Sequence, residues 1–147
     1  MKVLIVEDQA PIIFLEDAVK KVLPKYFPGF TKQDYDVAKW YTQAKELVEK
    51  NNYDLIFLDH RMPYEKPEVT EDEDFHKFSA SLQDIGYGLI PIMRERNPNT
   101  VIIGTSSLSG HELEYYSAPD YKINKVFDDV SAKLDEIVKE DFQKLSN

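Results

Sequence analysis

Residues 54–63 read DLIFLDHRMP, and this segment carries the clearest structural signal in the chain. Its central residues, Leu55 to Leu58, are large and apolar, and polar residues stand at both ends. A short apolar run of this kind is typical of a strand that is buried on both faces of a parallel sheet. Asp59 follows directly, so the strand is expected to present a carboxylate at its carboxyl end.

Four further runs have the length of strands. Val3 to Val6 and Val101 to Ile103 are strongly apolar, whereas Tyr35 to Ala38 and Tyr121 to Val126 are interrupted by charged residues. The apolar runs are expected inside the sheet and the charged runs at its edges. Stretches with helical spacing lie between the runs. This order predicts an α/β fold, a flavodoxin-like (βα)5 doubly wound parallel sheet with strand order 2-1-3-4-5.

Local signals place the ends of several helices. Thr42 is expected to cap the second helix, and Pro91 fits only in the first turn of the third. The segment from Ser109 to Glu112 resembles a capping box that opens a short fourth helix. Asp128 is expected to cap the fifth helix.

Residues 64–87 interrupt the alternation of strands and helices. The segment has little apolar periodicity and is rich in acidic residues: Glu65, Glu68, Glu71, Asp72, Glu73 and Asp74. It lies between the third strand and the third helix, where such folds usually need only a few residues. We interpret it as an insertion, with a short helix around residues 75–82, in a single domain that spans residues 1–147.

The composition limits the classes of function. The chain has 147 residues, of which 42% are hydrophobic and 31% charged, as expected for one globular domain. It has no cysteine, which excludes disulfides and cysteine nucleophiles. The formal net charge of −9 disfavours direct binding to nucleic acid or to an anionic membrane. With no membrane-spanning run and no signal peptide, we expect a cytoplasmic protein.

Three carboxylates should meet at one edge of the predicted sheet. Glu7 and Asp8 follow the first strand and Asp59 follows the third, at the point where the strand order reverses. Two unit charges about 4 Å apart repel by roughly 4 kcal/mol at an effective dielectric constant of 20. Either one carboxylate binds a proton or a cation lies among them. Mg²⁺ fits the second case, because it is usually held by one or two carboxylates plus a phosphate, and the site is then prepared for phosphoryl transfer to Asp59.

Phosphoryl transfer also needs a fixed positive charge and a hydroxyl near the reacting phosphorus. Thr105, at the end of the fourth strand, can supply the hydroxyl. Lys125 and Lys122, near the end of the fifth strand, can each supply the charge.

Residues 3–8, 54–63 and 101–106, together with Lys125, resemble the receiver domains of two-component response regulators. The resemblance covers the chain apart from the insertion. It implies a stand-alone domain that accepts a phosphoryl group from a histidine kinase or a phosphotransfer protein and then switches its contacts with an unknown protein target. Such a domain is not an enzyme with a separate substrate, because it catalyses only its own phosphorylation and dephosphorylation.

The resemblance assigns roles to individual residues. Asp59 would be the phosphoacceptor, Thr105 the hydroxyl that moves toward the phosphoryl group, and Lys125 the cation of the site. The Mg²⁺ ligands would be Glu7, Asp8, Asp59 and the backbone carbonyl of Arg61.

The region around the lysine departs from the family pattern. Lys125 is followed by Val126, where the family has proline, and Tyr121 stands one residue farther from the lysine than the family's switch aromatic does. Lys122 directly follows Tyr121, so Lys125 remains the better match. The spacing of Tyr121 thus departs from that of the family's conformational reporter.

Two other functions use parts of the same pattern. A receiver-like adaptor that is never phosphorylated would bind its partner constitutively, and the unusual fifth strand and the acidic insertion motivate this alternative. An aspartate-nucleophile phosphohydrolase would need a second Asp two residues after the nucleophile as general acid. That position is Arg61, which cannot donate a proton at neutral pH.

Overall fold

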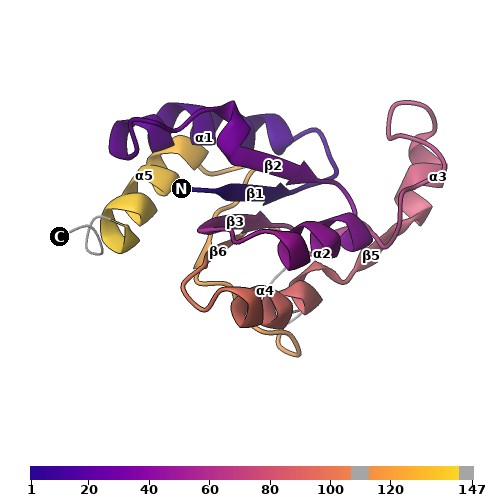
Figure 1. The fold of residues 1–147 in the computed structure, drawn as a ribbon. Helices are drawn as coiled ribbons and strands as arrows, with labels where there is room; N and C mark the ends of the chain where they lie inside the picture. Colours follow the sequence, from indigo (N-terminus) through magenta and orange to yellow (C-terminus); the bar gives the residue numbers. More distant parts are fainter. Residues whose placement is uncertain (107–112, 143–147) are drawn as a thin grey trace.

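The parallel sheet forms where the apolar runs predict it, in a computed structural model that describes residues 1–106 and 113–142 (Figure 1). Its strands are β1 (Val3–Val6), β2 (Tyr35–Ala38), β3 (Leu55–Leu58), β6 (Val101–Gly104) and β7 (Tyr121–Lys122). They lie in the order β2-β1-β3-β6-β7, and every neighbouring pair is parallel. Because β6 and β7 are the fourth and fifth predicted strands, the predicted order 2-1-3-4-5 is confirmed.

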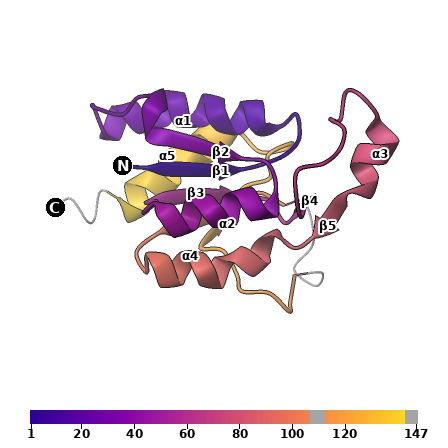
Figure 2. The same ribbon diagram turned by 45° about the vertical axis from the view of Figure 1, so that its right-hand side comes forward.

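Helices cover both faces of this sheet (Figures 1 and 2). The helices α1 (Ile12–Tyr26) and α5 (Val130–Asp141) pack on one face, and α2 (Tyr41–Lys50) and α4 (Ile90–Arg96) pack on the other. Short 3-10 helices, η1 and η2, span Lys32–Asp34 and Gly86–Leu89.

The central strands alternate between two apolar cores. Val3 and Ile5 of β1 contribute to the core under α1 and α5, whereas Leu4 and Val6 contribute to the core under α2 and α4. All residues of β1, β3 and β6 are buried. Burial on both faces explains why these strands are continuous apolar runs rather than alternating ones.

The fifth strand is shorter than the predicted range 121–126, because only Tyr121–Lys122 pairs with β6. The side-chain oxygen of Asn124 accepts hydrogen bonds from the N–H groups of Val126 and Phe127, both at 3.0 Å. An asparagine that binds nearby backbone groups in this way favours a turn over a strand. The chain therefore turns at Asn124 and leaves the sheet.

The predicted helix ends were partly wrong. The second helix is capped at Trp40, not at Thr42, whose N–H donates to the carbonyl of Tyr64 at 3.0 Å. The fifth helix is capped by Asp129, which accepts from the N–H of Ala132, whereas Asp128 accepts from the N–H of Asn124.

The other helix predictions had different outcomes. Pro91 does lie in the first turn of α4, as predicted. The predicted capping box at Ser109 to Glu112 lies outside the described residues, and residues 113–120 form turns and bends without a helix.

The insertion is closed at its base by an antiparallel hairpin that the sequence analysis did not predict. The strands β4 (Arg61–Pro63) and β5 (Leu82–Asp84) pair with each other, and residues 64–81, called the insertion from here on, run between them. The predicted helix is α3 (Phe75–Ala80), which lies beyond the carboxyl ends of the parallel strands (Figure 2). Strands of three residues show no periodicity that a sequence can reveal.

Within the part of the chain that the structure describes, no helix combines the length and the apolar character needed to cross a bilayer.

Candidate metal and phosphoryl-transfer site

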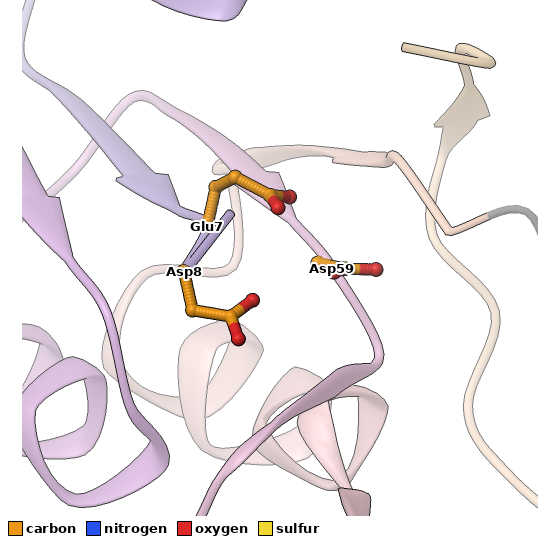
Figure 3. Close-up of side chains that lie close together, drawn as sticks. All are labelled: Glu7, Asp8 and Asp59. Atoms are coloured by element: carbon orange, nitrogen blue, oxygen red, sulfur yellow. The ribbon is translucent and has the colours of Figure 1, made fainter. Parts of the chain in front are cut away.

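The ends of β1 and β3 bring the three predicted carboxylates together (Figure 3). Val6 of β1 is level with Leu58 of β3, and the N–H of Asp59 donates to the carbonyl of Val6 at 3.1 Å. One carboxylate oxygen from each of Glu7, Asp8 and Asp59 lies within 4.8 Å of the others. The predicted convergence of these side chains is therefore present in the fold.

Lys125 is the lysine that reaches this cluster. Its Nζ lies 2.5 Å from Oε2 of Glu7 and 3.0 Å from Oδ2 of Asp59, and its side chain is 9% exposed. The turn at Asn124 directs it inward, whereas Lys122 on β7 is exposed. The geometry thus favours Lys125 over Lys122 as the cation of the site, although its role in a reaction stays a prediction.

The carboxylate of Asp59 is held on both sides. Oδ1 accepts a hydrogen bond from the N–H of His60 at 2.8 Å, and Oδ2 pairs with Lys125. Asp59 is 5% exposed. These two contacts fix the orientation of the carboxylate.

Burial gives the carboxyl groups unusual acidities. Burial and the nearby charge of Asp59 raise the pKa of Glu7 to about 8, although Lys125 opposes this shift. The same two causes raise the pKa of Asp8 to about 7. For Lys125, burial lowers the pKa, but the charges of Asp59 and Glu7 outweigh burial and raise it, so the ammonium stays protonated. Full ionisation of the three carboxylates beside a single ammonium would leave excess negative charge, which favours the binding of a proton or a cation in the cluster.

Asp8 is the carboxylate that is best placed to bind a metal ion. Both of its carboxylate oxygens are buried and make no hydrogen bond to any residue in 1–106 or 113–142. Glu7, by contrast, accepts from the N–H of Gln9 at 3.2 Å and from Lys125. Unpartnered carboxylate oxygens next to a second carboxylate fit a hard divalent cation such as Mg²⁺.

Thr105 lies level with Asp59 on the neighbouring strand. Its N–H donates to the carbonyl of Leu58 at 3.0 Å, and its side chain is buried. Its hydroxyl has no hydrogen-bond partner among the described residues. Within residues 1–106 and 113–142, no side chain or backbone group competes for this hydroxyl with a group that binds beside Asp59.

Arg61 begins β4, and its exposed guanidinium lies 4.0 Å from the carboxylate of Asp84. Only its backbone carbonyl was assigned to the metal ion, and that assignment stays a prediction. Tyr121, the doubtful switch aromatic, hydrogen-bonds through its side chain to Asp141 of α5.

Sequence reasoning missed two residues beside the cluster. His60 is buried, and its Nδ1 accepts a hydrogen bond from the N–H of Tyr87 at 3.0 Å. Tyr87 is buried as well, although it falls in a segment that looked polar. The signal in the sequence was Gly86, since an isolated glycine can mark a close approach of two backbone segments. In the structure, a Cβ at this position would collide with the carbonyl of Asp59.

Neither a protein-family model nor a curated protein sequence matches this chain. Solved structures do match it. A CheY-like response regulator receiver domain from Methanospirillum hungatei JF-1 superposes with a TM-score of 0.62 and 17% identity over 97% of both chains. This chain has the receiver fold. The likeness extends over nearly the whole length of both chains, so the insertion is accommodated without a change of architecture.

Two further receiver structures are described with ions or modifications. The receiver domain of sensor histidine kinase PA1611 from Pseudomonas aeruginosa PAO1, with a magnesium ion coordinated in its active-site cleft, has a TM-score of 0.60 and 17% identity over 97% of both chains. A response regulator from Burkholderia pseudomallei contains a phosphorylated aspartic acid, a calcium ion and citrate. Its TM-score is 0.55 at 14% identity, over 99% of this chain and 74% of that one.

Proposed function

We propose that residues 1–147 form one receiver domain that acts as a Mg²⁺-dependent phosphorylation switch, with Asp59 as the phosphoacceptor. The observation that carries this proposal is the buried cluster of Glu7, Asp8 and Asp59 beside the Lys125 ammonium, at the carboxyl edge of a receiver fold. Magnesium and a phosphorylated aspartate in similar receivers support it.

The donor in this proposal is a phosphohistidine of a histidine kinase or a phosphotransfer protein. An oxygen of the Asp59 carboxylate attacks phosphorus, the new P–O bond forms as the P–N bond breaks, and the imidazole nitrogen leaves with the electron pair. The His60 N–H and Lys125 hold the carboxylate for this attack. The domain catalyses only this transfer and the later hydrolysis of its own phosphoryl group.

The metal ion would be held by Asp8, Asp59 and the backbone carbonyl of Arg61, with Glu7 close by. When bound, Mg²⁺ neutralises the charge on the phosphoryl oxygens. Glu7, which accepts from the N–H of Gln9 and from Lys125, would complete the acidic ligand set.

After transfer, Lys125 and Thr105 stabilise the product. The ammonium pairs with a phosphoryl oxygen, and the hydroxyl of Thr105, which has no partner among the residues that the structure describes, donates to another. Phosphorylation adds about −1.5 to −2 charges at this point. The domain would then change its contacts with a downstream protein in the cytoplasm, and its net charge of −9 argues against direct contact with nucleic acid or an anionic membrane.

Phosphorylation by acetyl phosphate in the presence of Mg²⁺ tests the proposal. Intact-mass spectrometry should find one phosphoryl group on the wild type and on Asp17→Asn, a matched control at an exposed position of α1. Asp59→Asn, or removal of Mg²⁺ by EDTA, should abolish the modification. Equal modification of Asp59→Asn would refute the assignment of the phosphoacceptor.

The alternative is a receiver-like adaptor that is not phosphorylated and binds its partner constitutively. The contact of Lys125 with both Glu7 and Asp59 favours it, because the ammonium partly neutralises the cluster without a metal ion. An adaptor would neither bind Mg²⁺ nor respond to Asp59→Asn. Mg²⁺ binding that depends on Asp59 would exclude it.

A further inference from the structure

Tyr87 is connected to the proposed phosphoacceptor through His60. It lies in η2, and its side chain is 1% exposed. Its N–H donates to Nδ1 of His60 at 3.0 Å, and the two rings are 4.9 Å apart between centroids. The N–H of His60 in turn donates to Asp59. Two hydrogen bonds therefore separate Tyr87 from the Asp59 carboxylate.

The other end of Tyr87 reaches the backbone around Thr105. Its hydroxyl fills the space beside Gly104, where a Cβ would collide with it, and it makes a hydrogen bond with the backbone of Ser106. Gly104 and Ser106 are the two chain neighbours of Thr105. The hydroxyl of Tyr87 thus contacts the chain on both sides of the residue that is expected to move toward the phosphoryl group.

The base of the insertion is attached to the same residues. The carbonyl of His60 accepts hydrogen bonds from the N–H groups of Ile85, at 3.0 Å, and Gly86, at 2.7 Å, directly after β5. The hydroxyl of Tyr116 donates to the carbonyl of Asp84 in β5 at 3.0 Å, and its ring lies 4.5 Å from that of His60. Through His60, the hairpin that closes the insertion is therefore linked to the proposed phosphorylation site by hydrogen bonds and a ring contact.

We propose that Tyr87 is a positioning residue that holds Thr105 and couples phosphorylation of Asp59 to a rearrangement of the hairpin at the base of the insertion. The inference rests on the proposed function. A shift of Thr105 toward a phosphoryl group displaces Ser106, and the hydrogen bond to Ser106 transmits this displacement to Tyr87. Because Tyr87 follows β5 closely, the hairpin moves with it.

Hydrogen exchange measured by mass spectrometry on the full chain tests this coupling. The wild type is compared with and without Mg²⁺ and beryllofluoride, a phosphoryl mimic. In the wild type the mimic should change the exchange rates of peptides that cover residues 61–63 and 82–87. Tyr87→Phe should reduce this change about fivefold, the effect of losing a hydrogen bond with a net value near 1 kcal/mol. The readout is the difference in exchange rate that the mimic causes. If the Tyr87 hydroxyl only stabilised the fold, its removal would leave this difference unchanged.

The matched control is Tyr115→Phe, whose side chain is 89% exposed and which should behave as the wild type. If Tyr87→Phe does not fold, Tyr116→Phe removes the link to Asp84 and should also reduce the response. An unchanged hairpin in wild-type protein that acetyl phosphate does phosphorylate would overturn this inference and leave the proposed function intact. Absence of any phosphorylation of Asp59 would overturn both.

Discussion

Replacing Lys125 by methionine removes the only ammonium that contacts the carboxylate cluster among the described residues. Methionine keeps most of the volume and the apolar stem of lysine, so the change is mainly electrostatic. Glu7, 1% exposed, and Asp59, 5% exposed, are left without a counter-charge. We predict a large loss of stability in the metal-free protein.

The magnitude follows from the burial of the partners. Removing one member of a buried ion pair costs about 3–5 kcal/mol. Glu7 relieves part of this penalty by binding a proton, because its pKa is already raised to about 8 and loses the opposing effect of Lys125. We therefore expect a loss near the lower limit, about 3 kcal/mol at pH 7. At roughly 2–4 °C per kcal/mol for a domain of this size, Tm should fall by about 6–12 °C.

Urea denaturation followed by circular dichroism, in EDTA at pH 7, measures this loss. Lys122→Met is the matched control, because this lysine is exposed on β7, and we expect a change within about 0.5 kcal/mol. The double variant Asp59→Asn/Lys125→Met should recover part of the stability, since it also removes a carboxylate that loses its partner in Lys125→Met. A Lys125→Met protein within 1 kcal/mol of the wild type, or an equal loss in Lys122→Met, would refute the electrostatic reasoning.

Three further predictions concern the metal site and its packing. Protons compete with Mg²⁺ for Asp8, whose pKa is raised to about 7, so calorimetry should find at least tenfold weaker Mg²⁺ binding at pH 6 than at pH 8; an affinity independent of pH would contradict this. The pKa of Asp8 is near 4 in the unfolded chain and about 7 in the folded protein. The contribution of this group to stability is therefore fully present below pH 4 and is lost as pH rises through about 7, where the buried carboxyl group ionises. Asp8→Asn should therefore raise the stability of the metal-free protein on the order of 1 kcal/mol at pH 8 but not at pH 4, and a thermal melt that shows no gain at pH 8 would count against it. Gly86→Ala should destabilise the fold by about 1–3 kcal/mol, because the new Cβ collides with the carbonyl of Asp59, whereas Gly88→Ala meets no atom within 4 Å and should not; similar denaturation midpoints for the two variants would disprove the collision.

The errors in predicting helix ends have a common cause. Thr42 and Asp128 are suitable caps by residue type, yet other partners bind them: the Tyr64 carbonyl accepts from the N–H of Thr42, and Asp128 binds the N–H of Asn124. In both cases the helix begins at another residue: Trp40, which makes no side-chain cap, precedes the second helix, and Asp129, whose carboxylate accepts from the N–H of Ala132, precedes the fifth. Residue type identifies a side chain that is able to cap a helix, but it does not fix the residue at which the helix begins.

The core and the meeting of the carboxylates were determined by the sequence. A strand buried on both faces must be apolar throughout, so β1, β3 and residues 101–103 of β6 are visible without coordinates. Parallel strands end at the same edge of a sheet, which brings Glu7, Asp8 and Asp59 together once the strand order is inferred.

The tertiary structure alone decided which lysine reaches the cluster and how the insertion is attached. Lys125 and Glu7 are 118 positions apart, and the turn at Asn124, rather than any local periodicity, directs the ammonium inward. The hairpin of β4 and β5, and the burial of His60 and Tyr87 beside Asp59, depend on contacts between segments with no regular pattern of their own. A buried strand repeats the same environment along its length, so its sequence shows a pattern. A single buried side chain such as Lys125, or a strand of three residues, has no such repeat and depends on contacts with distant parts of the chain.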